Sequence, residues 1–360
     1  MANTLGLPKD LIGLIEGVAE GMASLLKIVS GWYSDRIGKR KGVILAGYAL
    51  STAVKPLLAL ARVGPHVLGV RVADRIGKGV RTSARDALLA DSVLPEHRGR
   101  AYGFHRSMDT AGAIVGTLLA IALLQLFAGD HRRVFLVATV AGVLAVLTII
   151  FGVREGPRTE KTAAKADSKP SVPGSLPLFL VAHGLFSAGN FSYAFFLLRA
   201  EDVGVAPALV PALYLLHNVV YALAAFPAGA LLDRLGARRA QVLAYGTHTL
   251  ACLGFAVYAA PSLMPLWFAL YGIQLGATGA CTRATAAGLI KSSRRGFGMG
   301  VFHACEGGGL LLASVIGGSL WERLGSGAAP FYFGAGMAVL ACLLAYFALR
   351  PGQPAPKTGC

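Results

Sequence analysis

Apolar stretches of about 20 residues alternate with short polar segments from one end of the chain to the other. Each stretch is long enough to cross a bilayer as an α-helix. The pattern predicts helices over residues 9–34, 42–62, 66–91, 101–128, 133–153, 176–199, 207–232, 239–260, 263–289, 297–321 and 329–349. The sequence therefore predicts an all-α polytopic membrane protein with eleven transmembrane helices.

One hydrophilic segment divides these helices into two sets. Residues 154–175 are rich in Lys, Ala, Pro and Ser, as expected of a linker. We therefore predict an N-terminal helical bundle over residues 1–153, a linker at 154–175, a C-terminal bundle over 176–350 and a tail at 351–360.

Composition supports the membrane assignment. Of the 360 residues, 55% are hydrophobic and 14% charged, and the mean hydropathy is +0.60, whereas soluble proteins carry about 25% charged residues. The net charge of +16 resides largely in short loops, which is typical of cytoplasmic loops and argues against nucleic-acid binding. Alternation of basic and weakly charged loops places the linker and the C-terminus in the cytoplasm, on the inner side of the plasma (inner) membrane.

A short motif occurs twice, with its aspartates 198 residues apart. It reads GWYSDRIGKRK from Gly31 and GALLDRLGARR from Gly229. A repeat of this period in so apolar a chain predicts two similar membrane halves. Its recurring positions are Gly31, Asp35, Arg36, Gly38 and Arg40 in the first copy and Gly229, Asp233, Arg234, Gly236 and Arg238 in the second.

The same spacing predicts that the first half, as given, lacks its opening helix. The counterpart of the helix that begins near Leu176 would precede Met1. Three explanations stay open: a misassigned start, a truncated gene, or a protein with eleven spans.

The twin motif, the helix spacing and the central linker resemble the major facilitator superfamily, in its bacterial type, over essentially the whole chain. The resemblance implies two pseudo-symmetric six-helix bundles, twelve helices in the full fold, and alternating access to a central cavity. It makes the motif a gating element, in which Asp35 and Asp233 either cap a following element or pair with arginine across the bundle interface. The alternative is that the motif only fixes the topology.

The predicted helix at 66–91 carries the clearest functional signal. Its charged residues fall within an arc of roughly 140° on a helical wheel, and lipid is a costly environment for them. They are Arg71, Asp74, Arg75, Lys78, Arg81, Arg85 and Asp86. The net charge of +3 favours an anionic solute, so we predict that Arg71, Arg75, Lys78 and Arg85 bind substrate. Internal salt bridges are the alternative.

Arg85 has a counterpart in the second half. Arg283 lies 198 residues further on, in an otherwise apolar helix. We predict that these two arginines clamp a carboxylate or a phosphate. Asn190, which forms a polar cluster with Ser192 and Tyr193, is predicted to hydrogen-bond substrate, or alternatively another helix.

Carboxylates inside the first predicted helix are candidates for proton coupling. Glu16 and Glu20 share one face with Lys27. Either glutamate exchanges a proton during transport, or Lys27 and the neighbouring arginines neutralise both.

Two acid–histidine pairs are further candidates. Asp109 follows His105 by four residues, Glu306 follows His303 by three, and the two histidines are 198 residues apart. Each pair is suited to relay protons near neutral pH. A structural role at a helix end is the alternative.

These features predict a secondary active transporter of a small anionic organic solute, coupled to protons, which acts as a monomer in the lipid bilayer. The alternatives are a proton-coupled exporter of drugs or metabolites and a non-transporting remnant or sensor. The glycine pattern Gly112-Ala-Ile-Val-Gly116-Thr117 partly resembles a motif of such exporters. The chain has no G-x-x-x-x-G-K-[ST] loop for ATP. It also has no H-E-x-x-H or Ser/His/Asp pattern, so we predict neither enzymatic activity nor a cofactor.

Overall fold

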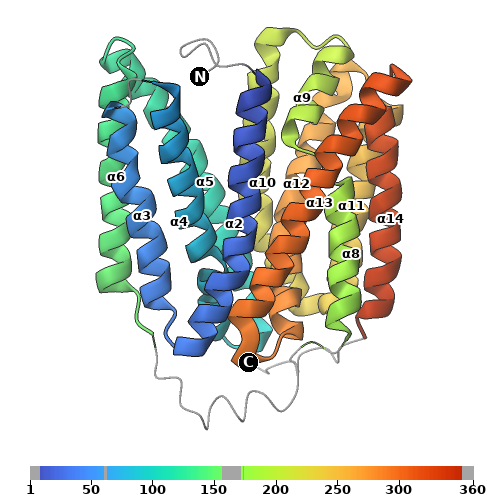
Figure 1. The fold of residues 1–360 in the computed structure, drawn as a ribbon. Coiled ribbons are helices and arrows are strands. Elements are labelled where there is room, and N and C mark those ends of the chain that lie inside the picture. Colours follow the sequence, from blue (N-terminus) through green and yellow to red (C-terminus); the bar gives the residue numbers. More distant parts are fainter. Residues whose placement is uncertain (1–8, 61–62, 156–171, 173, 351–360) are drawn as a thin grey trace, which may run out of the picture. The chain divides into compact units, whose positions relative to one another are not determined.

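Helices make up the computed structural model (Figure 1), which describes residues 9–60, 63–155, 172 and 174–350, with residues 9–21 and 64 as backbone only. The first half contains α2 (Lys9–Ile37), α3 (Lys41–Leu60), α4 (Gly64–Asp91), α5 (Arg98–Leu126) and α6 (His131–Gly152). The second half contains α8 (Leu176–Gly189), α9 (Tyr193–Asp202), α10 (Val210–Leu235), α11 (Ala237–Val257), α12 (Met264–Leu289), α13 (Arg295–Leu324) and α14 (Ala329–Ala348). The predicted all-α membrane fold is confirmed.

Contacts between residues group the chain into two compact units. Unit 1 comprises Met1–Leu88, Gly116–Lys169 and Lys291–Ala304, and unit 2 comprises Leu89–Val115, Pro170–Ile290 and Cys305–Cys360. Helices α5 and α13 are each divided between the units, because the beginning of each helix contacts elements from the other half of the sequence.

Eight described segments are long and apolar enough to cross a membrane by length and composition alone. Helix α4 is not among them, because it carries the charged residues noted above. Helix α4 therefore differs in its charge from the eight candidate spans.

Small residues allow the helices of unit 1 to pack closely. A Cβ atom on Gly47 of α3 would lie 2.6 Å from the carbonyl oxygen of Gly77 on α4, so the two backbones are in contact. Helices α3 and α6 run side by side (Figure 1), with Gly142 of α6 against Thr52 of α3. Close approach at small residues is the usual way in which membrane helices associate.

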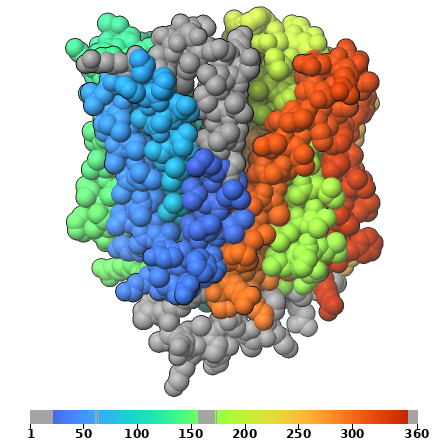
Figure 2. Space-filling view, viewed as in Figure 1, coloured from blue at the N-terminus to red at the C-terminus, as the bar shows by residue number. Residues whose placement is uncertain are grey.

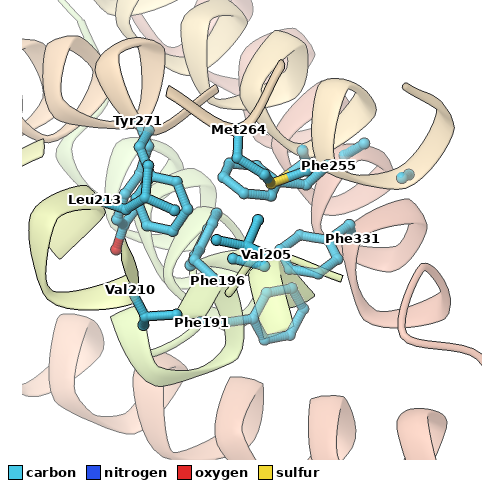
Figure 3. Close-up of a cluster of buried hydrophobic side chains, with 14 of the residues drawn as sticks. Phe191, Phe196, Val205, Val210, Leu213, Phe255, Met264, Tyr271 and Phe331 are labelled. Atoms are coloured by element: carbon cyan, nitrogen blue, oxygen red, sulfur yellow. The ribbon is translucent and has the colours of Figure 1, made fainter. Parts of the chain in front are cut away.

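Unit 2 has an aromatic core. Phe191, Phe196, Phe255, Tyr271 and Phe331 come from five different segments and meet in one buried cluster (Figure 3). The rings of Phe196 and Tyr271 are stacked with centroids 3.9 Å apart. A second cluster joins α8, α11 and α14, and the side chains of α8 and α14 mesh along the face shown in Figure 2.

The segment predicted as one helix at 176–199 is broken. Helix α8 ends at Gly189, the backbone is irregular over residues 190–192, and α9 starts at Tyr193. Asn190 is the C-cap of α8, and the Ser192 side chain accepts a hydrogen bond from the Ala194 N–H as the N-cap of α9. The polar cluster noted in the sequence therefore coincides with the interruption, where the Ser192 side chain satisfies an N–H group at the start of α9.

Candidate functional site

The first copy of the motif caps a helix that is distant in the sequence. Both carboxylate oxygens of Asp35, near the end of α2, accept backbone hydrogen bonds at the start of α13, from Gly296 N–H (3.0 Å) and Phe297 N–H (2.8 Å). A carboxylate at a helix N-terminus satisfies unpaired N–H groups and interacts favourably with the helix dipole. Asp35 therefore holds the beginning of α13 within unit 1.

The second copy repeats this geometry within unit 2. Asp233, near the end of α10, accepts hydrogen bonds from Gly99 N–H (2.7 Å) and Arg100 N–H (2.9 Å) at the start of α5. Each aspartate therefore caps a helix from the opposite half of the sequence, and not the element that directly follows its motif.

Glycine is required at the points of contact. A Cβ atom on Gly31 would overlap the carbonyl oxygen of Gly296, and one on Gly229 would overlap that of Gly99. Further along each motif, Gly38 and Gly236 have φ angles of +64° and +80°, a conformation that favours glycine. Helix packing and turn formation thus account for all four motif glycines.

The motif arginines differ between the copies. Arg40 is 1% exposed, and its Nη2 atom lies 3.2 Å from Asp35 Oδ1. Its counterpart Arg238 instead places its guanidinium carbon 3.4 Å from the ring centroid of Tyr346 on α14. Arg36 and Arg234 are exposed. The capping aspartate is therefore common to both copies of the motif, whereas the equivalent basic residues have different partners.

Helix α4 presents cations of two kinds. Arg81 donates a hydrogen bond to Ser51 Oγ (2.7 Å) and lies over the ring of Tyr48, so it ties α4 to α3. Arg71 and Lys78 are exposed, and Arg75 is partly exposed. At least one of the seven charged side chains, Arg81, thus has a structural role, which is to join α4 to α3.

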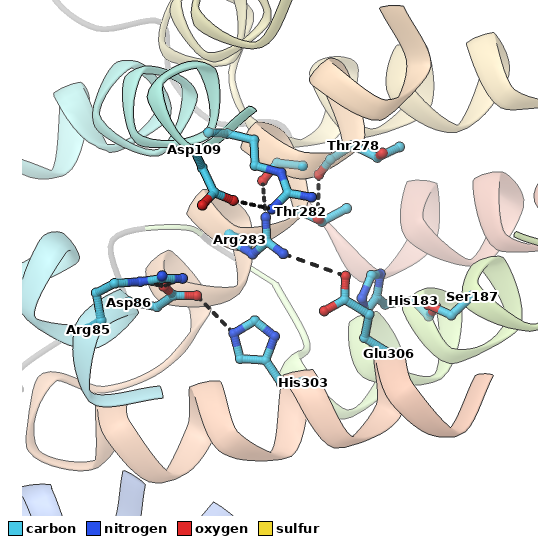
Figure 4. Close-up of polar contacts among 12 residues, drawn as sticks. Arg85, Asp86, Asp109, His183, Ser187, Thr278, Thr282, Arg283, His303 and Glu306 are labelled. Carbon is cyan, nitrogen blue, oxygen red and sulfur yellow. Dashed lines mark hydrogen bonds and ion pairs between the residues drawn. The ribbon is translucent and has the colours of Figure 1, made fainter. Parts of the chain in front are cut away.

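At the end of α4 that contacts α13, the partly exposed Arg85 and the buried Asp86 and His303 form a cluster (Figure 4). Asp86 Oδ1 accepts hydrogen bonds from Nε (3.2 Å) and Nη2 (3.1 Å) of Arg85, and Asp86 Oδ2 lies 2.8 Å from Nε2 of His303 on α13. The side chains of Asp86 and His303 are 1% and 2% exposed. His303, which the spacing associated with Glu306, is thus bound to an aspartate of α4.

Glu306 belongs to an ion pair in unit 2. Its Oε1 atom lies 3.7 Å from Nη2 of Arg283 on α12, which also donates to the Gly279 carbonyl (Figure 4). Asp109 of α5 forms an ion pair with Arg106 (3.1 Å), whereas its spacing in the sequence had associated it with His105. Arg106 also donates to the hydroxyl of Tyr221 on α10.

The 198-residue spacing does not hold along α5 and α13. The equivalent capped residues Gly99 and Gly296 lie 197 apart, and so do Gly103 and Gly300, which pack against backbone carbonyls of equivalent residues on α10 and α2. The proposed correspondence of His105 with His303 is therefore wrong by one residue. The position equivalent to His303 is occupied by Arg106.

Among the described residues, no three His, Cys, Asp or Glu side chains gather closely enough to hold a metal ion. Glu16 and Glu20 lie on α2 where side chains are outside the described part of the structure. Lys27, on the same helix, is buried.

Comparison with known proteins decides the family. The chain matches the profile of the Major Facilitator Superfamily over residues 1–198 and again over residues 179–359. The chain belongs to the major facilitator superfamily.

Relatives and solved structures agree with this assignment. The chain is 32% identical over 344 residues to the uncharacterized MFS-type transporter MJ1317 of Methanocaldococcus jannaschii, which covers 93% of this chain and 85% of that protein. Its fold is similar to that of a double tryptophan mutant of XylE (TM-score 0.79, 12% identity, 98% and 91% of the two chains). It is also similar to the human organic anion transporter MFSD10 (TM-score 0.73, 17% identity, 96% and 87%). At these identities the structural likeness shows the fold alone.

This major facilitator protein also contains a polar cluster that the sequence interpretation missed. On α11, Gln241, Tyr245, His248 and Cys252 are buried. His248 Nε2 lies 3.2 Å from the Gly189 carbonyl oxygen at the end of α8, and Tyr245 Oη lies 3.4 Å from Nδ1 of His183 on α8. The spacing of four, three and four residues places the α11 side chains on one helix face, and this was the available signal.

Proposed function

We propose that this major facilitator protein is a secondary active transporter of a small anionic organic solute, coupled to protons and working by alternating access as a monomer in the inner membrane. The cationic face of α4 carries the proposal. Arg71, Arg75, Lys78 and Arg85 add four cations to one helix of a protein whose other helices are largely apolar. Charged side chains inside a membrane helix are energetically costly, and they commonly mark the pathway of a substrate or an ion.

Arg85 and Arg283 are the arginines that we propose bind the carboxylate or phosphate of the solute. Each is held in a defined position by a carboxylate of its own unit, Asp86 for Arg85 and Glu306 for Arg283. A guanidinium has five N–H donors and can bind more than one acceptor. Arg71, Arg75, Lys78 and Asn190 are proposed as further solute contacts.

Glu306 and Asp109 are proposed to take part in proton coupling together with Glu16 and Glu20. Glu306 and Asp109 occupy equivalent positions, 197 residues apart, and both are paired with an arginine. Protonation of such a carboxylate releases its arginine, which gives a physical link between proton binding and solute binding.

Counterflow in proteoliposomes tests the proposal. Vesicles containing the purified protein and a panel of unlabelled carboxylates or organic phosphates are diluted into the matching radiolabelled solute. We expect exchange of at least one anion, and its abolition in both Arg85→Ala and Arg283→Ala. Arg81→Ala is the matched control, because it removes a cation from the same helix that is directed to Ser51 and Tyr48.

Absence of counterflow for every anion would overturn the proposed substrate class. Normal counterflow in both arginine variants would remove them from the solute site. The thermal stability of each variant in detergent shows whether a loss of transport comes from misfolding.

A further inference from the structure

The break between α8 and α9 leaves a backbone carbonyl group that needs a donor from outside its own helix. The segment Leu176–Asp202 is one candidate span, and the break at residues 190–192 lies near its middle. The last carbonyl groups of a helix have no partner within that helix, and the hydrocarbon core of a membrane supplies no water in exchange. In the part of the chain that the structure describes, no backbone N–H group donates to the carbonyl of Gly189, the last residue of α8. A side chain has to supply the donor.

A histidine of α11 is that donor. His248 Nε2 lies 3.2 Å from the Gly189 carbonyl oxygen, and the histidine is 0% exposed. A carbonyl oxygen only accepts hydrogen bonds, so Nε2 carries the hydrogen. The ring of Phe186 on α8 packs against the imidazole with the centroids 5.0 Å apart, and Sγ of Cys252 on α11 lies 3.4 Å from Nε2. These neighbours hold the imidazole in the orientation that directs Nε2 at the carbonyl.

The end of α8 is also in close contact with α14. A Cβ atom on Gly334 would lie 2.8 Å from the Gly189 carbonyl oxygen, and one on Gly189 would lie 2.7 Å from Cβ of Met337. The two backbones meet at the break because neither glycine carries a side chain. Helix α8 therefore ends between close packing from α14 and a hydrogen bond from α11, and all these elements belong to unit 2.

Both polar groups of the peptide unit between Gly189 and Asn190 are hydrogen-bonded. Its carbonyl accepts from His248, and its N–H group donates to the Ser187 carbonyl (3.2 Å). A peptide unit is planar, so one bond at each of these groups fixes the orientation of the whole unit. This unit leads directly into Asn190, whose Oδ1 atom is buried and has no hydrogen-bond partner among the described residues. The direction of the Asn190 side chain thus depends on the bond from His248.

We propose that His248 is a positioning residue, which fixes the peptide unit at the end of α8 and thereby directs the Asn190 side chain to the solute. The fixed peptide unit concerns unit 2 by itself and needs no solute. The effect on solute binding rests on the proposed transport function, in which Asn190 is a solute contact.

Labelling of a single peptide bond tests the first step without any solute. Gly189–Asn190 is the only Gly-Asn pair in the sequence. Glycine labelled with ¹³C at the carbonyl and asparagine labelled with ¹⁵N therefore give one correlated solid-state NMR signal from the full chain in lipid bilayers. Loss of a hydrogen bond moves a carbonyl ¹³C signal upfield. We expect this shift in His248→Phe and in His248→Leu, which lack the donor.

Two variants separate the hydrogen bond from the packing of the ring. His248→Gln has an N–H donor and should return the Gly189 signal toward its wild-type position. Tyr245→Phe is the matched control, because it removes a buried hydroxyl group of the same helix that lies next to His183 instead, and it should leave the signal unchanged. The two donor-free variants differ in size, so one remains informative where the other does not fold. An unshifted signal in a folded donor-free variant, or an equal shift in His248→Gln, overturns the proposal.

The solute concentration at half-maximal counterflow (KM) tests the consequence. Asn190→Ala and His248→Phe should each raise KM about 2- to 12-fold, the equivalent of one hydrogen bond, with little change in the maximal rate. The double variant should have nearly the KM of Asn190→Ala, because His248 acts through Asn190, and His248→Gln should be close to wild type. A normal KM in His248→Phe, or two effects that multiply in the double variant, overturns the positioning role. Failure of every anion to exchange in the wild type contradicts the proposed function instead, and the NMR signal then decides on the peptide unit alone.

Discussion

The two motif contacts, Asp35 with the start of α13 and Asp233 with the start of α5, have the same backbone geometry and different side-chain chemistry. In each, an aspartate accepts two N–H bonds and a glycine pair brings the backbones together. The nearby side chains differ, because His303 and Arg106 occupy equivalent positions and have different partners. The repeated backbone arrangement is therefore the common structural element, and the side chains around it supply what is specific to each half.

Alanine at the contact glycines should have the largest effect. In Gly31→Ala and Gly229→Ala the new Cβ overlaps a backbone carbonyl that cannot move aside without shifting its helix. We expect each to lose about 1–3 kcal/mol of unfolding free energy, seen as lower thermal stability in detergent. Gly42→Ala is the control, since its Cβ would meet no atom within 4 Å. A small loss at one site and a large loss at the other would show that the two contacts are not equivalent.

Removal of the capping carboxylates should come next. Loss of an N-cap costs about 0.5–2 kcal/mol, and Asp35→Ala should lie at the upper end. It also deprives the fully buried Arg40 of its carboxylate, whereas Arg100, the partner of Asp233, is 48% exposed. Thermal unfolding of Asp35→Ala and Asp233→Ala makes the comparison, with the asparagine variants as controls that keep an acceptor. Equal losses would contradict a contribution from Arg40.

The helices and the motif were predictable from the sequence, and the partners of the motif were not. Apolar stretches of spanning length predict helices within a few residues of those observed, and a repeat at 198 residues identifies Asp35 and Asp233 as equivalent. Their partners are backbone N–H groups more than 130 residues away, and every residue type has an N–H group. No side-chain pattern marks such a partner.

A one-residue difference in loop length explains the incorrect histidine correspondence. Residues 92–94 separate α4 from the following turn at Pro95, whereas only residues 290–291 separate α12 from the turn at Ser292. Beyond this loop the spacing falls to 197, so a constant offset matches His105 to the wrong residue. The helix break at residues 190–192 escaped prediction because apolar residues flank it on both sides.

Exchange of Arg106 for histidine tests whether the residue type at this position determines how the stability of the protein varies with pH. Arg106→His places a titratable group at the position equivalent to His303, next to Asp109 and Tyr221. We expect the difference in thermal stability from wild type to vary between about pH 5 and 8. In the control Arg106→Lys the difference should stay constant, because lysine remains charged. A constant difference in both variants would show that the surroundings, rather than the residue type, determine the response.

The motif arginines should show the smallest effect, and a double-mutant cycle can isolate it. Arg238 lies over the ring of Tyr346, which is 47% exposed, and cation–π contacts at exposed sites contribute about 0.5–1 kcal/mol. We expect Arg238→Ala and Tyr346→Leu each to lose about that amount of unfolding free energy. The double variant should lose less than the sum of the two, because both substitutions remove the same contact. Tyr346→Phe keeps the ring and should be close to wild type. Strict additivity would mean that the contact contributes nothing, and that the second motif copy needs its arginine only for topology.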